Sequence, residues 1–306
     1  MKRVAAQLAL LGVLGLLAPA SAHAAACCLS STAFGVGRLS AWEQASLGLQ
    51  FAGAPSPGAW NENEVFVPNA ARTSQVEFRA SLIGLLSLHE RVQLSARLPW
   101  VLNVQQAGVA HDVGHGLGDG LLTARFEPIS IGEYEWLPGV ALTLGVTAPL
   151  GRSMNQSKSL LASDVTGRGA WALGAGVTVE QTWAKWFVQG NFGLTVPLPM
   201  QSAFGPGTQR FGPAVDVLLA AGREVSRDVV VSALVRGTFE TPLMVNEDPV
   251  PNASARDLGV ALAAAFKLNA HLTLQAACDT GIFVSGFGDN RPARVTGTLG
   301  VRYGFF

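Results

Sequence analysis

The sequence predicts an all-β protein, a transmembrane antiparallel up-and-down β-barrel of about twelve strands. First, apolar and polar residues alternate along many segments, as they do in strands with one face in an apolar medium. Second, the chain is 49% hydrophobic and only 14% charged, well below the roughly 25% charged residues of a soluble domain. Third, no uninterrupted apolar run after Ala24 approaches the roughly 18 residues that a membrane helix needs. Because a bilayer accommodates only helices and closed sheets, these observations favour a closed barrel.

The N-terminal residues have the pattern of a cleaved secretory signal peptide. Lys2 and Arg3 form a charged start, residues 4–17 form an apolar run, and Ala22 and Ala24 form a small-x-small cleavage site. We therefore expect a signal peptide over 1–24, a periplasmic lead-in over 25–40 and the barrel over 41–306.

The cysteines add little to this organisation. Cys27 follows the signal peptide and is a candidate for lipoprotein acylation, but residues 24–26 lack the large aliphatic residue that such a site requires. Three cysteines do not form a disulfide framework.

The alternation predicts each strand in turn. The expected strands are 41–52, 74–86, 91–102, 116–128, 138–150, 166–181, 185–198, 211–223, 228–241, 255–268, 271–283 and 292–306. The connections alternate between short turns, such as the one at His89, and longer loops rich in Gly, Pro, Asn and Ser, such as 53–73. Outer-membrane barrels separate periplasmic turns from external loops in this way.

The ionisable residues on the other face of these strands are the candidate lining of a solute pathway. They are Glu77, Arg79, Arg97, Asp119, Arg125, Glu127, Glu180, Asp216, Arg236, Glu240, Asp257, Lys267, Asp279, Arg294 and Arg302. Acids and bases nearly balance, which argues against a pore that is sharply selective for one sign of charge. The alternative is that these residues form ion pairs that fill the interior. Twelve strands enclose less space than an open sixteen-stranded porin, so the passage is either narrow or plugged.

Composition and motifs argue against several other functions. Equal numbers of basic and acidic residues exclude the basic excess of a nucleic-acid-binding protein. His111, Asp112 and His115 are the candidates for metal binding or catalysis, but they fall in a predicted loop, whereas an i, i+4 histidine pair binds a metal on a helix. We therefore expect no enzyme activity, no catalytic residue, no metal and no cofactor.

The last expected strand resembles the C-terminal signal strand of Gram-negative outer-membrane β-barrels. The apolar residues Val295, Leu299 and Val301 lead to the aromatic residues Tyr303, Phe305 and Phe306. In that class the final Phe keeps the alternation, whereas here Phe305 keeps it and Phe306 lies one step beyond. The resemblance implies that these aromatic residues are the assembly signal, that the barrel-assembly machinery and outer-membrane lipid are partners, and that the protein is located in the cell outer membrane.

A second resemblance covers the segment that begins Gly116-Leu117-Gly118-Asp119-Gly120. This segment is similar to the Gly-x-Gly-Asp strand start of a broad group of outer-membrane transporters labelled phenol-degradation meta-pathway proteins. The resemblance implies uptake of small hydrophobic or aromatic compounds.

Two functional hypotheses follow. The first is a porin-like transporter that allows passive passage of a small, hydrophobic or aromatic solute. The second is a structural barrel that anchors a periplasmic or cell-surface complex and binds protein partners through its loops.

Overall fold

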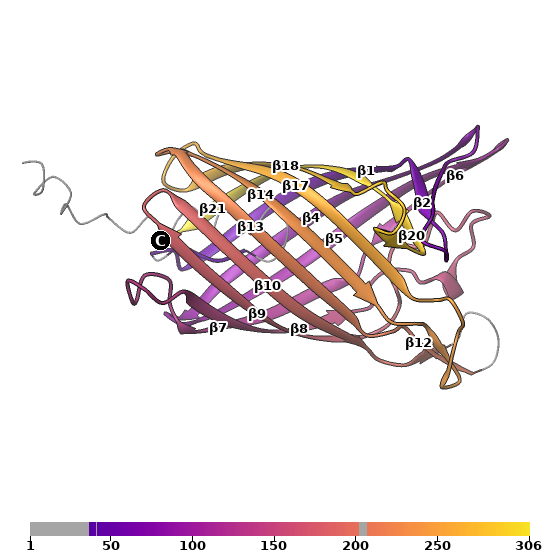
Figure 1. Ribbon diagram of the computed structural model, residues 1–306, viewed down its shortest axis with the longest axis horizontal. Coiled ribbons are helices and arrows are strands. Elements are labelled where there is room, and N and C mark those ends of the chain that lie inside the picture. Colours follow the sequence, from indigo (N-terminus) through magenta and orange to yellow (C-terminus); the bar gives the residue numbers. More distant parts are fainter. Residues whose placement is uncertain (1–36, 41, 202–206) are drawn as a thin grey trace, which may run out of the picture.

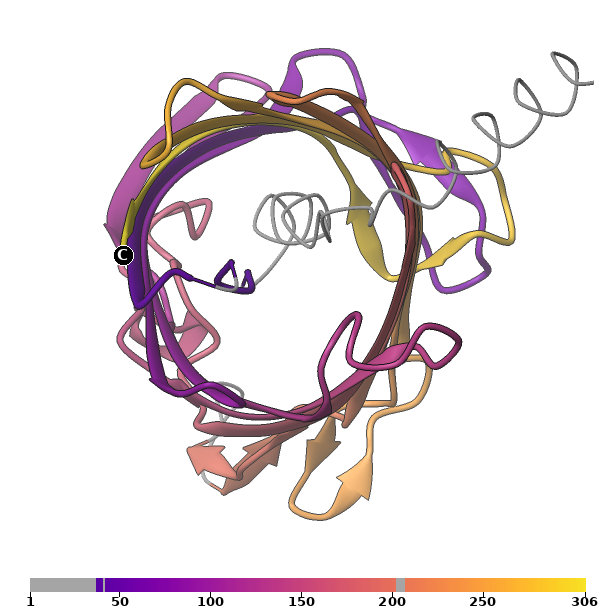
Figure 2. The ribbon, with the colours of Figure 1, turned by 90° about the vertical axis from the view of Figure 1, so that its left-hand side faces the viewer.

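The computed structural model describes residues 37–40, 42–201 and 207–306, which form one closed antiparallel β-barrel. The expected fold class is confirmed (Figures 1 and 2). The predicted signal peptide, Cys27 and most of the lead-in lie outside the described residues. Among the described residues, no helix is long and apolar enough to cross a membrane.

Twelve strands form the wall of the barrel. They are β1 (Ala45–Ser56), β4 (Thr73–His89), β5 (Val92–Ala107), β7 (Gly120–Ile129), β8 (Gly139–Ala148), β9 (Ala172–Trp183), β10 (Trp186–Pro197), β13 (Ala214–Ser226), β14 (Val229–Glu240), β17 (Ala255–Lys267), β18 (Leu272–Gly281) and β21 (Val295–Phe305). Each strand pairs with the neighbours that precede and follow it in this series. The first strand, β1, pairs with the last, β21, from Ala45 opposite Phe305 to Gly53 opposite Gly297, and this pairing closes the ring.

The two faces of the wall differ as the alternation predicts. Large apolar side chains on the outer face are exposed, including Leu144, Leu262 and Leu299, which are 65% to 67% exposed. Their sequence neighbours point inward and are smaller or polar, as Ala263 and Thr143 are. Burial of the outer side chains therefore requires lipid, because a soluble protein rarely exposes so large an apolar surface.

The two ends of the barrel also differ (Figure 1). The short-turn end carries tight connections such as those between β9 and β10 and between β13 and β14. The long-loop end carries additional short elements. These are β2 (Gly58–Trp60), β3 (Phe66–Pro68), β6 (Ala110–Leu117), the 3-10 helix η1 (Met154–Gln156), β11 (Met200–Gln201), β12 (Thr208–Arg210), β15 (Met244–Val245), β16 (Asp248–Pro249), β19 (Gly288–Asp289) and β20 (Arg291–Ala293).

The long-loop end departs most from the sequence predictions. A loop was expected over 103–115, but in the structure β5 continues to Ala107 and the chain returns as β6. The tight turn between the two strands is possible because Gly108 adopts a positive φ of 62°. The next wall strand therefore begins at Gly120 instead of Gly116. Similarly, β9 begins at Ala172, and residues 166–171 belong to the preceding loop.

An aromatic cluster fixes the small sheet of β2, β3 and β20 over one side of the mouth. Trp60 is 2% exposed, and its ring centroid lies 5.9 Å from that of Phe66 and 6.2 Å from that of Phe283. A Cβ atom on Gly288 would lie 2.1 Å from the Trp60 ring, so only glycine fits there. This packing holds the sheet of β2, β3 and β20 against β19 and against the loop between β18 and β19, which contains Phe283.

We expect Leu262→Arg to destabilise the barrel by about 2–4 kcal/mol, because Leu262 lies near the middle of β17 on the lipid face. The measurement is reversible unfolding in urea with phospholipid vesicles. The control is Thr143→Arg on the cavity-lining face, which breaks no side-chain hydrogen bond among the described residues and should lose at most about 1 kcal/mol. Equal losses for the two variants would contradict the assignment of the faces.

Candidate functional site

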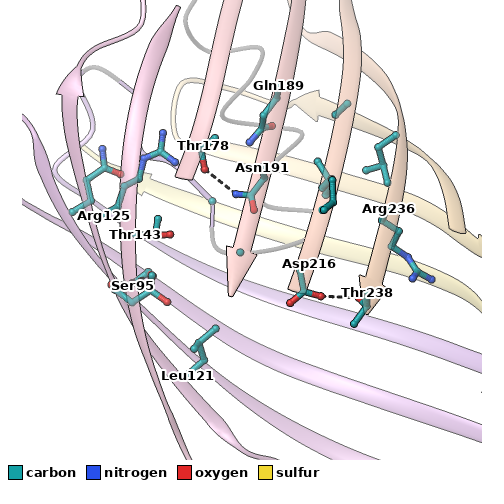
Figure 3. Close-up of a pocket in the computed structure, with 18 of the residues that line it drawn as sticks. Ser95, Leu121, Arg125, Thr143, Thr178, Gln189, Asn191, Asp216, Arg236 and Thr238 are labelled. Carbon is teal, nitrogen blue, oxygen red and sulfur yellow. Dashed lines mark hydrogen bonds between the residues drawn. The ribbon is translucent and has the colours of Figure 1, made fainter. Parts of the chain in front are cut away.

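The barrel encloses a cavity of about 430 Å³ (Figure 3). Its wall comes from β4, β5, β7, β8, β9, β10, β13 and β14, so it extends across more than half of the ring. Polar side chains that line it include Thr143, Asn191 and Asp216, whereas Leu121 and Leu234 are among the apolar ones. Asn191 Nδ2 donates to Thr178 Oγ1 at 2.8 Å, and the Thr238 hydroxyl donates to Asp216 Oδ1 at 2.6 Å. The cavity therefore presents both polar and apolar surface to a solute.

Residues 37–40 and 42–44, the described part of the segment before β1, lie inside the ring (Figure 2). Arg38 donates to both carboxylate oxygens of Glu127 at 2.8 Å, and the Leu39 N–H donates to Gln93 Oε1 at 3.1 Å. Leu39 is 3% exposed and packs against Ile83 and Leu85. Gly37 borders the cavity. This segment therefore narrows the interior at the level of these contacts.

A buried charge cluster joins this segment to the wall. Arg125 Nε lies 2.9 Å from Glu127 Oε1, and Arg125 Nη2 lies 3.6 Å from Glu180 Oε2. With Arg38, the cluster has two cations and two carboxylates, and both glutamates are 2% exposed. The pairing compensates the desolvation of four charged groups.

A second cluster lies on the opposite side of the ring. Arg236 forms a bidentate pair with Asp279, at 2.7 Å and 2.6 Å, and also donates to Asp257. Asp216 lies on the neighbouring strand β13 and is bonded to Thr238. This wall therefore carries three carboxylates and one arginine.

A third group lies on β4, β5 and the start of β21. Glu77 contacts two arginines, with Arg79 Nη2 at 2.5 Å and Arg294 Nη1 at 3.1 Å. Arg97 on β5 has no carboxylate within 4.0 Å among the residues that the structure describes. This wall carries an excess of positive charge.

The other expected lining residues lie at the two ends of the barrel. Asp119 lies in the bend between β6 and β7, where its carboxylate accepts hydrogen bonds from the backbone N–H groups of Gly151 and Arg168. Glu240 ends β14 and binds Arg168 and Arg291. At the short-turn end, Arg302 pairs with Glu43, and Lys267 ends β17.

The structure gives the Gly-x-Gly-Asp segment a local structural role. The two N–H groups bound by Asp119 belong to a different loop, 149–171, and a Cβ atom on Gly167 would lie 2.2 Å from Asp119 Oδ1. A Cβ atom on Gly118 would similarly lie 2.9 Å from Pro99. The segment therefore joins two loops at the mouth.

The aromatic residues of the C-terminal strand cluster at the short-turn end. Tyr303 contacts Phe305, with ring centroids 4.9 Å apart, and stacks on His271 at 5.5 Å. Phe306 contacts the same histidine at 5.1 Å. Their role as an assembly signal stays a prediction.

His111 and His115 lie on β6, which is a strand and not a helix. Residues four apart on a strand are separated by about 13 Å, which is too far for one metal ion. His115 stacks on Trp100 at 5.5 Å. No group of three His, Cys, Asp or Glu residues that could hold a metal occurs in the described part of the chain.

Asp112 and Asp164 order the long loop between β8 and β9. The hydroxyl of Ser159 and the N–H of Leu161 donate to Asp112 and lower its pKa. Burial raises the pKa of Asp164, but hydrogen bonds from Ser157, the Lys158 N–H and Arg152 outweigh burial and lower the pKa to about 2. Asp164 is therefore ionised at neutral pH and ties together residues of its own loop, whereas Asp112 of β6 fixes this loop against the β5–β6 hairpin.

Several residues of the interior were not predicted from the sequence. The expected set included only ionisable groups on wall strands, so it omitted the uncharged lining residues and the partners outside the wall, Arg38, Glu43, Arg168 and Arg291. The same alternation identifies the uncharged lining residues, because they occupy inward positions. No local pattern identifies the partners, which come from loops and from the segment before β1.

The comparisons with known proteins concern the fold. No protein-family model matches the sequence, and no curated protein matches it. The chain is similar to a solved COG4313 outer membrane channel from Pseudomonas putida F1, with 14% identity over 88% of this chain and 97% of that one and a TM-score of 0.70. It is also similar to the translocator domain of the autotransporter NalP from Neisseria meningitidis, with 12% identity over 99% and 98% of the two chains and a TM-score of 0.52.

The closed barrel and its exposed apolar belt place the protein in the outer membrane, as expected. The phenol-degradation label stays a prediction.

We expect Arg125→Leu to destabilise the protein by about 3–5 kcal/mol, because it leaves Glu127 and Glu180 buried with less compensation. The free energy of unfolding in urea is the measurement. The control Arg91→Leu breaks an exposed pair with Glu133 and should lose less than about 1 kcal/mol. Similar losses in the two variants would contradict a buried cluster.

The carboxyl ¹³C resonance of Asp164 should titrate with a midpoint of about 2. Because the folded pKa lies below the ordinary value of 3.8, the ionised Asp164 stabilises the loop above pH 3.8, and this contribution is lost as the pH falls towards 2. Arg152→Gln should raise the midpoint, whereas Arg210→Gln should not change it. A wild-type midpoint near 3.8 would contradict these contacts.

Proposed function

We propose that the protein is a narrow, porin-like channel for passive passage of a small solute with hydrophobic or aromatic character. The observation that carries this proposal is the polar and apolar cavity inside a closed, lipid-exposed barrel. A barrel that served only as an anchor would gain stability from a filled interior, and the cavity leaves that packing incomplete.

The composition of the cavity lining supports the class of solute. Small-molecule sites are mostly apolar and contain a few well-placed polar groups. In this cavity, aliphatic residues such as Leu218 and Leu234 line β13 and β14, and Thr143, Thr178 and Asn191 line the adjacent strands β8, β9 and β10. The lining suits a solute with an apolar body and one or two polar groups. The volume of about 430 Å³ lies within the range of small-molecule sites, roughly 300–1,000 Å³.

The segment before β1 makes the proposed passage narrow. Two ion pairs hold it to the wall, Arg38 with Glu127 and Glu43 with Arg302. A channel of this design would conduct ions weakly and would exclude large hydrophilic solutes.

Planar-bilayer recordings of the purified protein test the proposal. We expect small, discrete conductance steps from the wild-type protein. We expect the double variant Arg38→Ala/Glu43→Gln to raise the conductance several-fold, because the two substitutions release the segment before β1 from the wall. Glu133→Gln is the control, since its ion pair with Arg91 lies in a turn at the short-turn end and outside the cavity.

One result would contradict the channel, and another would contradict the constriction by the segment before β1. A folded wild-type barrel without conductance, confirmed by heat-modifiable gel mobility, would favour the anchoring hypothesis. Conductance that is unchanged by the double variant would show that the segment does not limit the passage.

A further inference from the structure

Arg97 occupies an unusual environment inside the barrel. Its side chain points inward from β5, and its cross-strand partners are Ile83 on β4 and Leu121 on β7, both aliphatic. On the same face of β5, the Ser95 hydroxyl donates to the Thr123 carbonyl and Pro99 has no donor. The guanidinium group is half-buried and has no carboxylate or hydrogen-bond acceptor among the described residues.

Arg79 adds a second cation next to Arg97. It lies close enough to act on Arg97 electrostatically, and its carboxylate partner, Glu77, is shared with Arg294. Three arginines and one glutamate therefore face the interior from this part of the wall. Partial burial of like charges is unfavourable unless an anion compensates them.

The cavity borders Arg97, whereas the arginines in its own lining are Arg125 and Arg236. Ser95 and Leu121, the neighbours of Arg97 along and across the sheet, both line it. An anion at this edge of the cavity would therefore lie next to the position of Arg97 and beside aliphatic side chains such as Leu121. The planar guanidinium group binds a carboxylate through two parallel hydrogen bonds.

The opposite side of the ring disfavours an anion. Five wall strands separate β5 from β14 on each side, so the two strands face each other across the barrel. Arg236 of β14 pairs with Asp257 of β17 and Asp279 of β18, and Asp216 of β13 adds a third carboxylate that is bonded to Thr238. Arg291 lies in the field of Asp216 and Asp257, but it binds Glu240 at the mouth. Coulomb forces therefore direct a carboxylate toward Arg97 and away from the acidic wall.

We propose that Arg97, assisted by Arg79, binds the carboxylate of a small organic acid whose apolar body lies against the aliphatic part of the cavity. This inference deepens the proposed function, because it names the class of solute that the passage takes. The site is a selectivity position inside the barrel. The net charge of the whole interior does not indicate this site, because acids and bases nearly balance and lie on opposite walls.

The test uses 4-fluorobenzoate as the probe and 4-fluorobenzamide as its neutral counterpart, with ¹⁹F NMR on the full chain in detergent and empty micelles as the blank. We expect saturable binding of the benzoate and at least tenfold weaker binding in Arg97→Gln, since a hydrogen bond to a charged group contributes about 1.5–3 kcal/mol. Arg97→Lys should bind with intermediate affinity, because it keeps the charge and loses the bidentate geometry.

Two controls separate a local site from a general charge effect. Arg210→Gln removes the same charge from an exposed loop strand and should not change binding. Asp216→Asn removes a negative charge from the opposite wall and should not weaken binding. Arg97→Gln should also leave the free energy of unfolding unchanged or raise it, because no ion pair is lost.

The proposal is overturned if wild-type protein does not bind the benzoate, if it binds the benzamide equally well, or if Arg97→Gln binds with unchanged affinity. Ion conductance in bilayers is recorded separately, so that failure of the site and failure of the channel can be distinguished. If the barrel conducts but does not bind the benzoate, the proposed function stands and the Arg97 site is rejected. A barrel that binds the benzoate through Arg97 and does not conduct would reject the channel and retain the site.

Discussion

Closure of the sheet on itself is the constraint on which the rest of the structure depends. Pairing of β1 with β21 leaves no wall strand with an open edge, so the backbone hydrogen bonds of the wall are satisfied without water. The outer face can then be largely apolar, and most charged side chains of the wall are directed inward; Arg223, which lies over the exposed Trp186 ring near the short-turn end, is an exception. The interior charges are thus a consequence of ring closure, and how they are paired decides what the interior can do.

Most of these charges are compensated inside the barrel. The cluster of Arg38, Arg125, Glu127 and Glu180 is balanced and buried, and it attaches the segment before β1 to the wall. Arg97 and Asp216 are different, because each faces the interior without an oppositely charged partner among the described residues. Because they lie on opposite sides of the ring, positive and negative charge are separated across the interior, although the net charge of the interior is close to zero.

The strands were largely predictable, and the mouth was not. The wall strand β10 differs from its predicted range by one residue at each end, because an alternating pattern with one apolar face permits a single register. The β5–β6 hairpin was missed, because glycine and polar residues interrupt the alternation in 103–115. The loop that Asp119 binds was predicted, but it extends to residue 171 instead of ending before residue 166. Arg168 and Arg291 were missed, because loop residues acquire partners only when distant segments meet.

The sequence alone determined the fold class, the strand positions and the face on which each side chain lies, because period-two alternation is a local property that each strand expresses by itself. Only the tertiary structure decided which charges are neighbours. Glu77 meets Arg294 across 217 positions of sequence, and Arg97 meets no acid within the described part of the chain, because ring closure and strand register set these distances. Whether a charge is paired depends on distances in three dimensions, so only the tertiary structure could show that Arg97 lacks a carboxylate partner among the described residues.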